Sequence, residues 1–230
     1  MEHRIIPILV TVVLILIGHI TMRIARSDYI KRKQFTVSFQ NNFISLINDF
    51  GATHSLNSVF YERCIHDVDK IQEELDGAGV IAEFIDPLSG IRGRNYQLFM
   101  NILPELRKLS GMLDNIIVAN RCEQLIGLCD DALQRHEGNL DRAIDQISSQ
   151  LWNPIACLGN GMRWIIWLPG NIFEWAGIIS TQKVHAVHQN RIVKFIENVI
   201  VIIGLVGSVF TIILGWNDMI DLIVRFLKMG

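Results

Sequence analysis

The sequence predicts an all-α integral membrane protein with two transmembrane helices, a cytoplasmic helical bundle and a tryptophan-rich interfacial or re-entrant segment. Strongly apolar residues make up 50% of the 230 residues, and the mean hydropathy is +0.31. Both values exceed those of an ordinary soluble domain. The excess is confined to residues 5–22 and 199–216, two stretches of 18 residues without Asp, Glu, Lys or Arg. Helical rather than alternating periodicity prevails between them.

Each apolar stretch is long enough to cross a bilayer, because 18 helical residues extend about 27 Å and the hydrocarbon core is about 30 Å thick. Residues 5–22 are predicted to be an uncleaved anchor. No small-residue cleavage site follows them, since the next residues are Arg23, Ile24, Ala25 and Arg26.

Basic residues flank both stretches unequally, and Lys and Arg resist translocation. Arg4 precedes the first stretch, whereas five basic residues follow it: Arg23, Arg26, Lys31, Arg32 and Lys33. Before the second stretch lie Lys183, Arg191 and Lys194, and after it only Arg225 and Lys228. Residues 23–198 are therefore predicted to be cytoplasmic, in a bacterial inner membrane.

Charge and cysteine usage agree with this orientation. Residues 23–33 carry a net charge of +4, whereas residues 34–162 hold 9 basic and 17 acidic residues. The basic segment suits anionic headgroups, whereas the negative charge of residues 34–162 disfavours nucleic-acid binding there, so no nucleic-acid partner is expected. Four cysteines without a C-x-x-C pair are expected to be reduced: Cys64, Cys122, Cys129 and Cys157.

The cytoplasmic domain, residues 23–162, is expected to be helical. The first membrane helix is predicted to continue to Phe50 and to end at Gly51. A second helix is predicted over 56–75 with Ser55 as N-cap, then a loop over 77–94 and a long helix over 101–134. Asn139 is expected to cap a short further helix.

A coiled-coil-like seam is predicted on the long helix, because its apolar residues recur in steps of four and three. The seam consists of Ile102, Leu106, Leu109, Leu113 and Ile116. Packing inside the protein's own bundle is the favoured interpretation, and self-association is the alternative. Gly111 weakens an autonomous coiled coil by about 1 kcal/mol.

The tryptophan-rich segment, residues 163–180, is predicted to lie at the membrane interface or to re-enter it. Pro169 and Gly170 divide it into pieces too short to cross a bilayer. Tryptophan prefers the headgroup level, so the predicted interface residues are Arg163, Trp164, Trp167 and Trp175. A hydrophobic core and a third span are the alternatives.

The second membrane helix is expected over 183–216, with an amphipathic tail over 218–229. Gly204, Gly207 and Ser208 form a small-residue pattern that suits close helix packing. His19 is an ionisable residue inside the first stretch and is therefore a functional candidate.

No catalytic residue, metal site or cofactor is predicted. His185 and His188 lie three residues apart without further ligands at a recognisable spacing, and Asp67 and Asp69 lack the glycine of a calcium loop. No phosphate-binding loop, dinucleotide fingerprint or nucleophile elbow occurs.

The sequence therefore favours a non-enzymatic two-pass membrane protein whose helical domain mediates protein–protein interaction or self-assembly. Its expected partners are membrane lipids and either further copies of itself or another protein. One alternative is an oligomeric pore-forming effector of a toxin or defence type. The other is an interfacial lipid-acting enzyme using His185 and His188.

Overall fold

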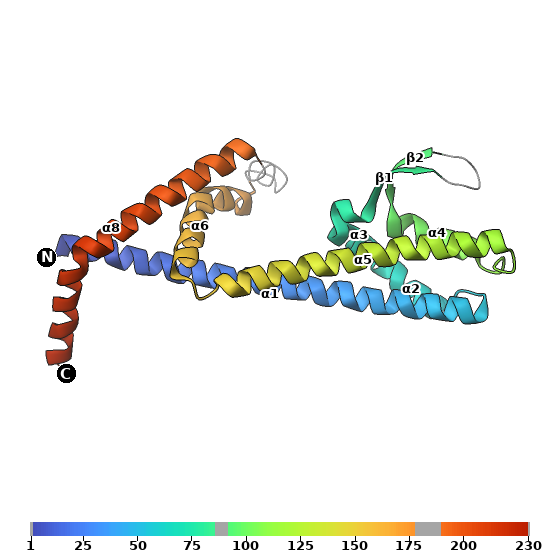
Figure 1. The fold of residues 1–230 in the computed structure, drawn as a ribbon, viewed down its shortest axis with the longest axis horizontal. Coiled ribbons are helices and arrows are strands. Elements are labelled where there is room, and N and C mark those ends of the chain that lie inside the picture. Colours follow the sequence, from blue (N-terminus) through green and yellow to red (C-terminus); the bar gives the residue numbers. More distant parts are fainter. Residues whose placement is uncertain (1, 86–91, 178–189, 230) are drawn as a thin grey trace. The chain divides into compact units, whose positions relative to one another are not determined.

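The computed structural model describes residues 2–85, 92–177 and 190–229 and divides into two compact units (Figure 1). One unit, Asp28–Ile144, is called the helical domain below. The other, Met1–Ser27 with Asp145–Gly230, is called the apolar unit. Most of the described chain is helical, as the sequence predicts.

The first helix, α1 (Glu2–Thr53), is continuous through the predicted membrane stretch and the basic residues. The sequence predicts an end at Gly51, but the helix continues to Thr53. Gly51 is exposed, and a Cβ there would meet no atom within 4 Å. No close contact therefore requires a glycine at this position, and the helix passes through it. Glycine lowers helix stability by about 1 kcal/mol without excluding the helix.

The helix predicted over 56–75 is in fact two helices, α2 (Ser58–His66) and α3 (Val68–Leu75), separated at Asp67. The predicted N-cap, Ser55, is wrong. Asn57 caps α2, because its side-chain oxygen accepts a hydrogen bond of 3.0 Å from the backbone N–H of Val59.

A β-hairpin occupies most of the segment that the sequence predicts to be a loop. After the short 3₁₀ helix η1 (Asp76–Gly79), β1 (Val80–Ile85) pairs antiparallel with β2 (Arg92–Gln97). Val80 lies opposite Gln97, and Glu83 opposite Arg94. Neither strand alternates clearly in sequence, so pairing between them, rather than local pattern, produces the hairpin.

The helix predicted over 101–134 is also two helices, α4 (Leu98–Leu109) and α5 (Ile116–Gln150). Gly111 lies between them with a φ of +81°, a left-handed conformation that glycine adopts readily. The separate short helix expected after Asn139 does not form. Leu133 and Leu140 are both buried at seven-residue spacing, so α5 presents one buried face across this position.

The core of the helical domain centres on aromatic contacts between α1 and α4. The ring of Phe99 lies edge-on to Phe39 and Phe43, with centroids 5.1 and 5.5 Å apart. All three side chains are almost completely buried. Residues of α3, α4 and α5 complete the core, among them Ile71, Ile102, Leu103, Leu125 and Leu133.

The apolar unit contains the N-terminal part of α1, the end of α5, α6 (Pro154–Trp175) and α8 (Arg191–Met229). Among the described residues, two helices are long and apolar enough to cross a membrane, α1 and the part of α8 over Arg191–Phe210. Only 17% and 6% of their apolar windows are buried inside the protein. The core helix of a soluble protein would instead have most of such a window covered.

Residues 163–175 of the tryptophan-rich segment lie in one helix, α6, which continues through Pro169. The sequence predicts two short pieces there. A proline removes one backbone hydrogen bond and can bend a helix without ending it, so the helical path persists. Figure 1 shows α6 leaving α1 at a steep angle and reaching α8.

Candidate functional site

A buried glutamine connects three elements of the helical domain. Gln72 on α3 is 6% exposed. Its side-chain amide donates a 2.8 Å hydrogen bond to the carbonyl of Gly79, and its side-chain oxygen accepts one of 3.2 Å from the N–H of Phe99. Gln72 therefore satisfies backbone groups at the start of the hairpin and at the start of α4.

Two carboxylates also join elements that are distant in sequence. Glu74 accepts a 2.7 Å hydrogen bond from Arg32 and lies 2.9 Å from Nε2 of His136. Glu105 accepts hydrogen bonds from the Tyr96 hydroxyl at 3.1 Å and from Arg121 at 3.4 Å. Burial, together with the charge of Glu105, raises the pKa of Tyr96. These groups hold the fold together.

The four cysteines are free and buried. Burial raises the pKa of the Cys64 thiol to about 11 and also raises the pKa of Cys122 and Cys129. Since the thiolate is the reactive form, these thiols are poor nucleophiles. Within the described residues, no group of three or more His, Cys, Asp or Glu side chains could hold a metal ion.

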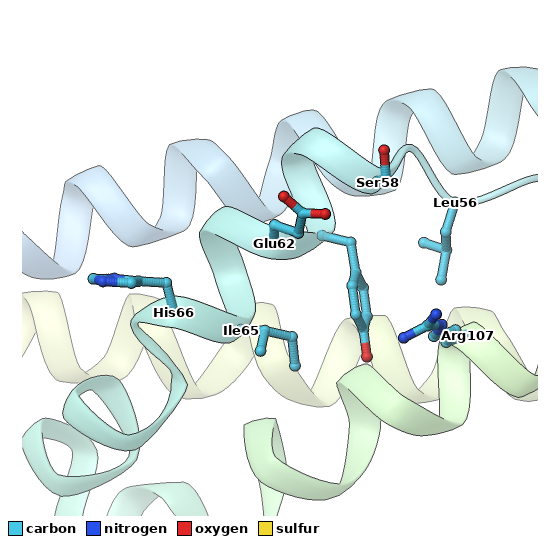
Figure 2. A pocket seen from close by; sticks show the side chains of 7 residues that line it. Leu56, Ser58, Glu62, Ile65, His66 and Arg107 are labelled. Carbon is cyan, nitrogen blue, oxygen red and sulfur yellow. The ribbon is translucent and has the colours of Figure 1, made fainter.

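An open hollow of 460 Å³ lies between α2 and α4 (Figure 2). Figure 2 shows Arg107 and Leu56 at one end of it and His66 at the other. The Arg107 guanidinium lies 5.3 Å from the centre of the Tyr61 ring, and His66 pairs with Asp67 at 2.9 Å. Because the polar groups do not converge on one point, the hollow lacks the geometry of a catalytic site.

A second hollow, called the domain groove below, has the composition of a binding surface. It measures 430 Å³ and lies between α1 and α5 of the helical domain. Its apolar residues are Phe43, Ile44, Ile47 and Ile126, and its polar ones include Glu123 and Asp130. Ile44 is 42% exposed. Gln134 donates a 2.7 Å hydrogen bond to Asp130.

The predicted seam divides between the core and the surface. Ile102 and Leu106 are completely buried, and Leu109 and Leu113 pack at the edge of the core. Ile116 is 74% exposed. Ile102, Leu106, Leu109 and Leu113 therefore pack within the domain, and the break between α4 and α5 separates them from Ile116.

His19 lies where α5 meets α6. Its Nδ1 atom is 3.0 Å from the carbonyl oxygen of Leu151, and its ring centre is 5.3 Å from that of Trp152. Trp152 is 79% exposed. His19 is thus a polar residue of the apolar unit with a defined backbone partner.

The predicted interface residues of α6 have different surroundings. Arg163 lies 3.3 Å from Glu197 and donates a 3.0 Å hydrogen bond to Asn198, both on α8. Trp164 is 38% exposed and Trp167 is half-buried. The side chain of Trp175 lies outside the described part of the chain, as do His185 and His188 and the side chains of the predicted tail.

Glycines set the helix packing of the apolar unit. Gly204 of α8 lies against Met162 of α6, whereas a Cβ at Gly207 would enter open space and Ser208 lines a groove. The closest approach is between α1 and α6. A Cβ at Gly18 would collide with the backbone of Cys157, and one at Gly161 with the backbone of Leu14. Gly18 and Gly161 are not among the residues predicted to pack helices, although glycine in an apolar helix is a signal of close packing.

Comparison of the chain with protein-family models, with curated proteins and with solved structures finds no match.

Proposed function

We propose that this chain is a non-enzymatic, two-span membrane protein whose helical domain binds a protein partner or a second copy of the chain. The exposed apolar surfaces of α1 and α8 support the membrane part, since lipid would cover them. The basic residues after the first stretch favour a cytoplasmic helical domain in a bacterial inner membrane.

The domain groove is the single observation that carries the binding part. It combines solvent-accessible apolar side chains, such as Ile44, with acidic residues at Glu123 and Asp130. Apolar contacts surrounded by polar groups are typical of protein–protein interfaces. Gln72, Glu74 and Glu105, in contrast, tie the elements of the domain together.

The test places a photo-crosslinking amino acid at Ile44 of the full chain in native membranes. Position 59 is the matched control, since Val59 is 53% exposed on α2 and does not line the groove. We expect an adduct of defined mass from position 44 and little or none from position 59. An adduct of twice the chain mass identifies a second copy, and a mixed adduct identifies a partner protein.

A pair of glycine variants tests whether the adduct depends on the groove. Gly127 lines the groove, Gly138 lies eleven residues further along α5, and a Cβ at either would meet open space. Gly127→Trp should abolish the position-44 adduct, whereas Gly138→Trp should leave it. Unreacted monomer from both crosslinking positions contradicts the proposal. A closed ring of chains that releases dye from vesicles would replace it with the pore alternative.

A further inference from the structure

A groove of 380 Å³ in the apolar unit, called the membrane groove below, lies between the N-terminal part of α1, α6 and α8. Its lining is almost entirely apolar and includes Ile15 of α1, Ile155 and Leu158 of α6, and Val206 and Val209 of α8. The volume falls within the range of about 300–1,000 Å³ that is usual for ligand sites.

The membrane groove lies on the two helices that are apolar enough to cross a membrane, and it is open to the outside. Ile155 is 63% exposed and Val206 is 49% exposed. In a bilayer this opening faces hydrocarbon rather than water. An unfilled apolar groove forfeits dispersion contacts with its lining, so a flexible hydrocarbon chain is a suitable occupant.

Polar groups continue from one end of the groove along α1. Ile15, His19 and Arg23 follow one another at intervals of four residues, so they share a face of the helix, with Arg23 about 12 Å beyond Ile15. His19 stacks near the exposed Trp152. Tryptophan and arginine are side chains typical of the headgroup level.

We propose that the membrane groove binds one anionic phospholipid, with an acyl chain between α6 and α8 and the phosphate beside Arg23 and Trp152. The positive charge of Arg23 and Arg26, which follow the groove on α1 within the same unit, favours an anionic headgroup. It disfavours a second parallel copy in the groove, because that copy would bring its own basic residues alongside. This lipid site rests on the membrane insertion that is part of the proposed function. It goes beyond that function, which concerns a protein partner only.

The experiment counts the lipids that the detergent-extracted full chain retains in native mass spectrometry, from an equal mixture of phosphatidylglycerol and phosphatidylcholine. We expect one phosphatidylglycerol to be retained preferentially. Arg23→Gln should lower that preference roughly five-fold, which corresponds to about 1 kcal/mol. Lys31→Gln is the control, since positions 15 and 31 lie on nearly opposite faces of α1.

A second pair of variants tests the acyl-chain part. Val206→Phe fills the groove and should lower retention of both lipids, whereas Ile203→Phe, at a 66% exposed position of α8 outside the lining, should not. Equal retention of the two lipids, or retention indifferent to Arg23→Gln and Val206→Phe, overturns the site. A dimer mass that disappears with Val206→Phe assigns the groove to a second copy.

Alkaline extraction of the membranes separates this inference from the proposed function. A chain released by alkali is not inserted, and the two-span proposal then fails together with the lipid site. A chain that stays in the membrane but retains no phosphatidylglycerol overturns only the lipid site. The crosslink at Ile44 is scored independently of either result.

Discussion

Single polar side chains determine how the helical domain is assembled. Gln72, Glu74 and Glu105 each join groups that are far apart in sequence, and Gln72 does so while almost completely buried. Removing one of these side chains leaves a buried hydrogen-bonding group without a partner, which typically lowers the free energy of unfolding by about 1–3 kcal/mol. The exposed His66, in contrast, pairs with its neighbour Asp67 rather than with a distant element of the described chain. The arrangement of the elements therefore depends on a few interior contacts.

Cys64 gives the helical domain a dependence on alkaline pH. Its pKa rises from 9.0 to about 11, chiefly through burial and then through the negative charge of Asp67. The folded state therefore holds this proton more tightly than the unfolded chain does. The resulting stability is complete below pH 9 and is lost as the pH rises through 11, by about 2 kcal/mol at that pH.

Urea unfolding of the detergent-extracted chain, followed by circular dichroism from pH 8 to pH 11, measures this effect. The unfolding free energy should fall across that range and fall less steeply in Cys64→Ala. The other buried thiols keep part of the slope in the variant, because burial also raises the pKa of Cys122 and Cys129. Identical slopes for the two chains would refute the assignment to Cys64.

At the scale of elements, close helix packing in the apolar unit depends on glycine. Gly18→Ala places a methyl group against the backbone of Cys157, which has no flexible atoms to move aside. Because the added methyl group pushes α1 away from α6, the free energy of unfolding should fall by about 1–3 kcal/mol, as it does when a core is overpacked. The measurement is the unfolding midpoint of the extracted chain in a titration with a denaturing detergent.

Gly207→Ala is the matched control for Gly18→Ala, because it lies in the same unit and its Cβ would enter open space. Its midpoint should stay unchanged or rise, since alanine favours a helix by about 1 kcal/mol over glycine. Equal losses in both variants would indicate that glycine content, rather than the approach of α1 to α6, sets the stability.

The sequence predicts elements well where local pattern decides and poorly where distant contacts do. Helical periodicity predicts α1 almost to its end, and charge-free length identifies both apolar helices. The hairpin of β1 and β2 depends on pairing between strands and on Gln72, neither of which is visible locally. The sequence alone marks Gly111 as unfavourable in a helix, but its left-handed backbone, which separates α4 from α5, is a property of the folded chain.

At the scale of the whole molecule, charge and apolar surface are separated along the chain. Most of the exposed apolar side chains of α1, and those of α8, belong to the apolar unit, and the excess of acidic residues belongs to residues 34–162. Such a distribution suits a protein that meets lipid with one unit and other proteins with the other. Two placements of α6 remain to be distinguished, a helix at the membrane interface and a third span. The depth of α6 in the membrane distinguishes them.

We predict that the part of α6 from Arg163 onward lies near the headgroups rather than across the bilayer. Arg163 pairs with Glu197, two residues before the charge-free stretch of α8 begins. An ion pair is strongly disfavoured in the hydrocarbon centre. Trp164 and Trp167, which follow Arg163 within about one turn of α6, should therefore lie at shallow depth.

The measurement is tryptophan quenching by lipids brominated at known depths, taken as the difference between the full chain and Trp164→Phe, Trp167→Phe. This difference removes the contribution of the other three tryptophans. Bromine near the headgroups should quench the pair most strongly. Strongest quenching at the bilayer centre would make α6 a third span and would reverse the side of the membrane on which α8 begins. Absence of quenching would mean that protein covers both indoles, contrary to the exposure of Trp164.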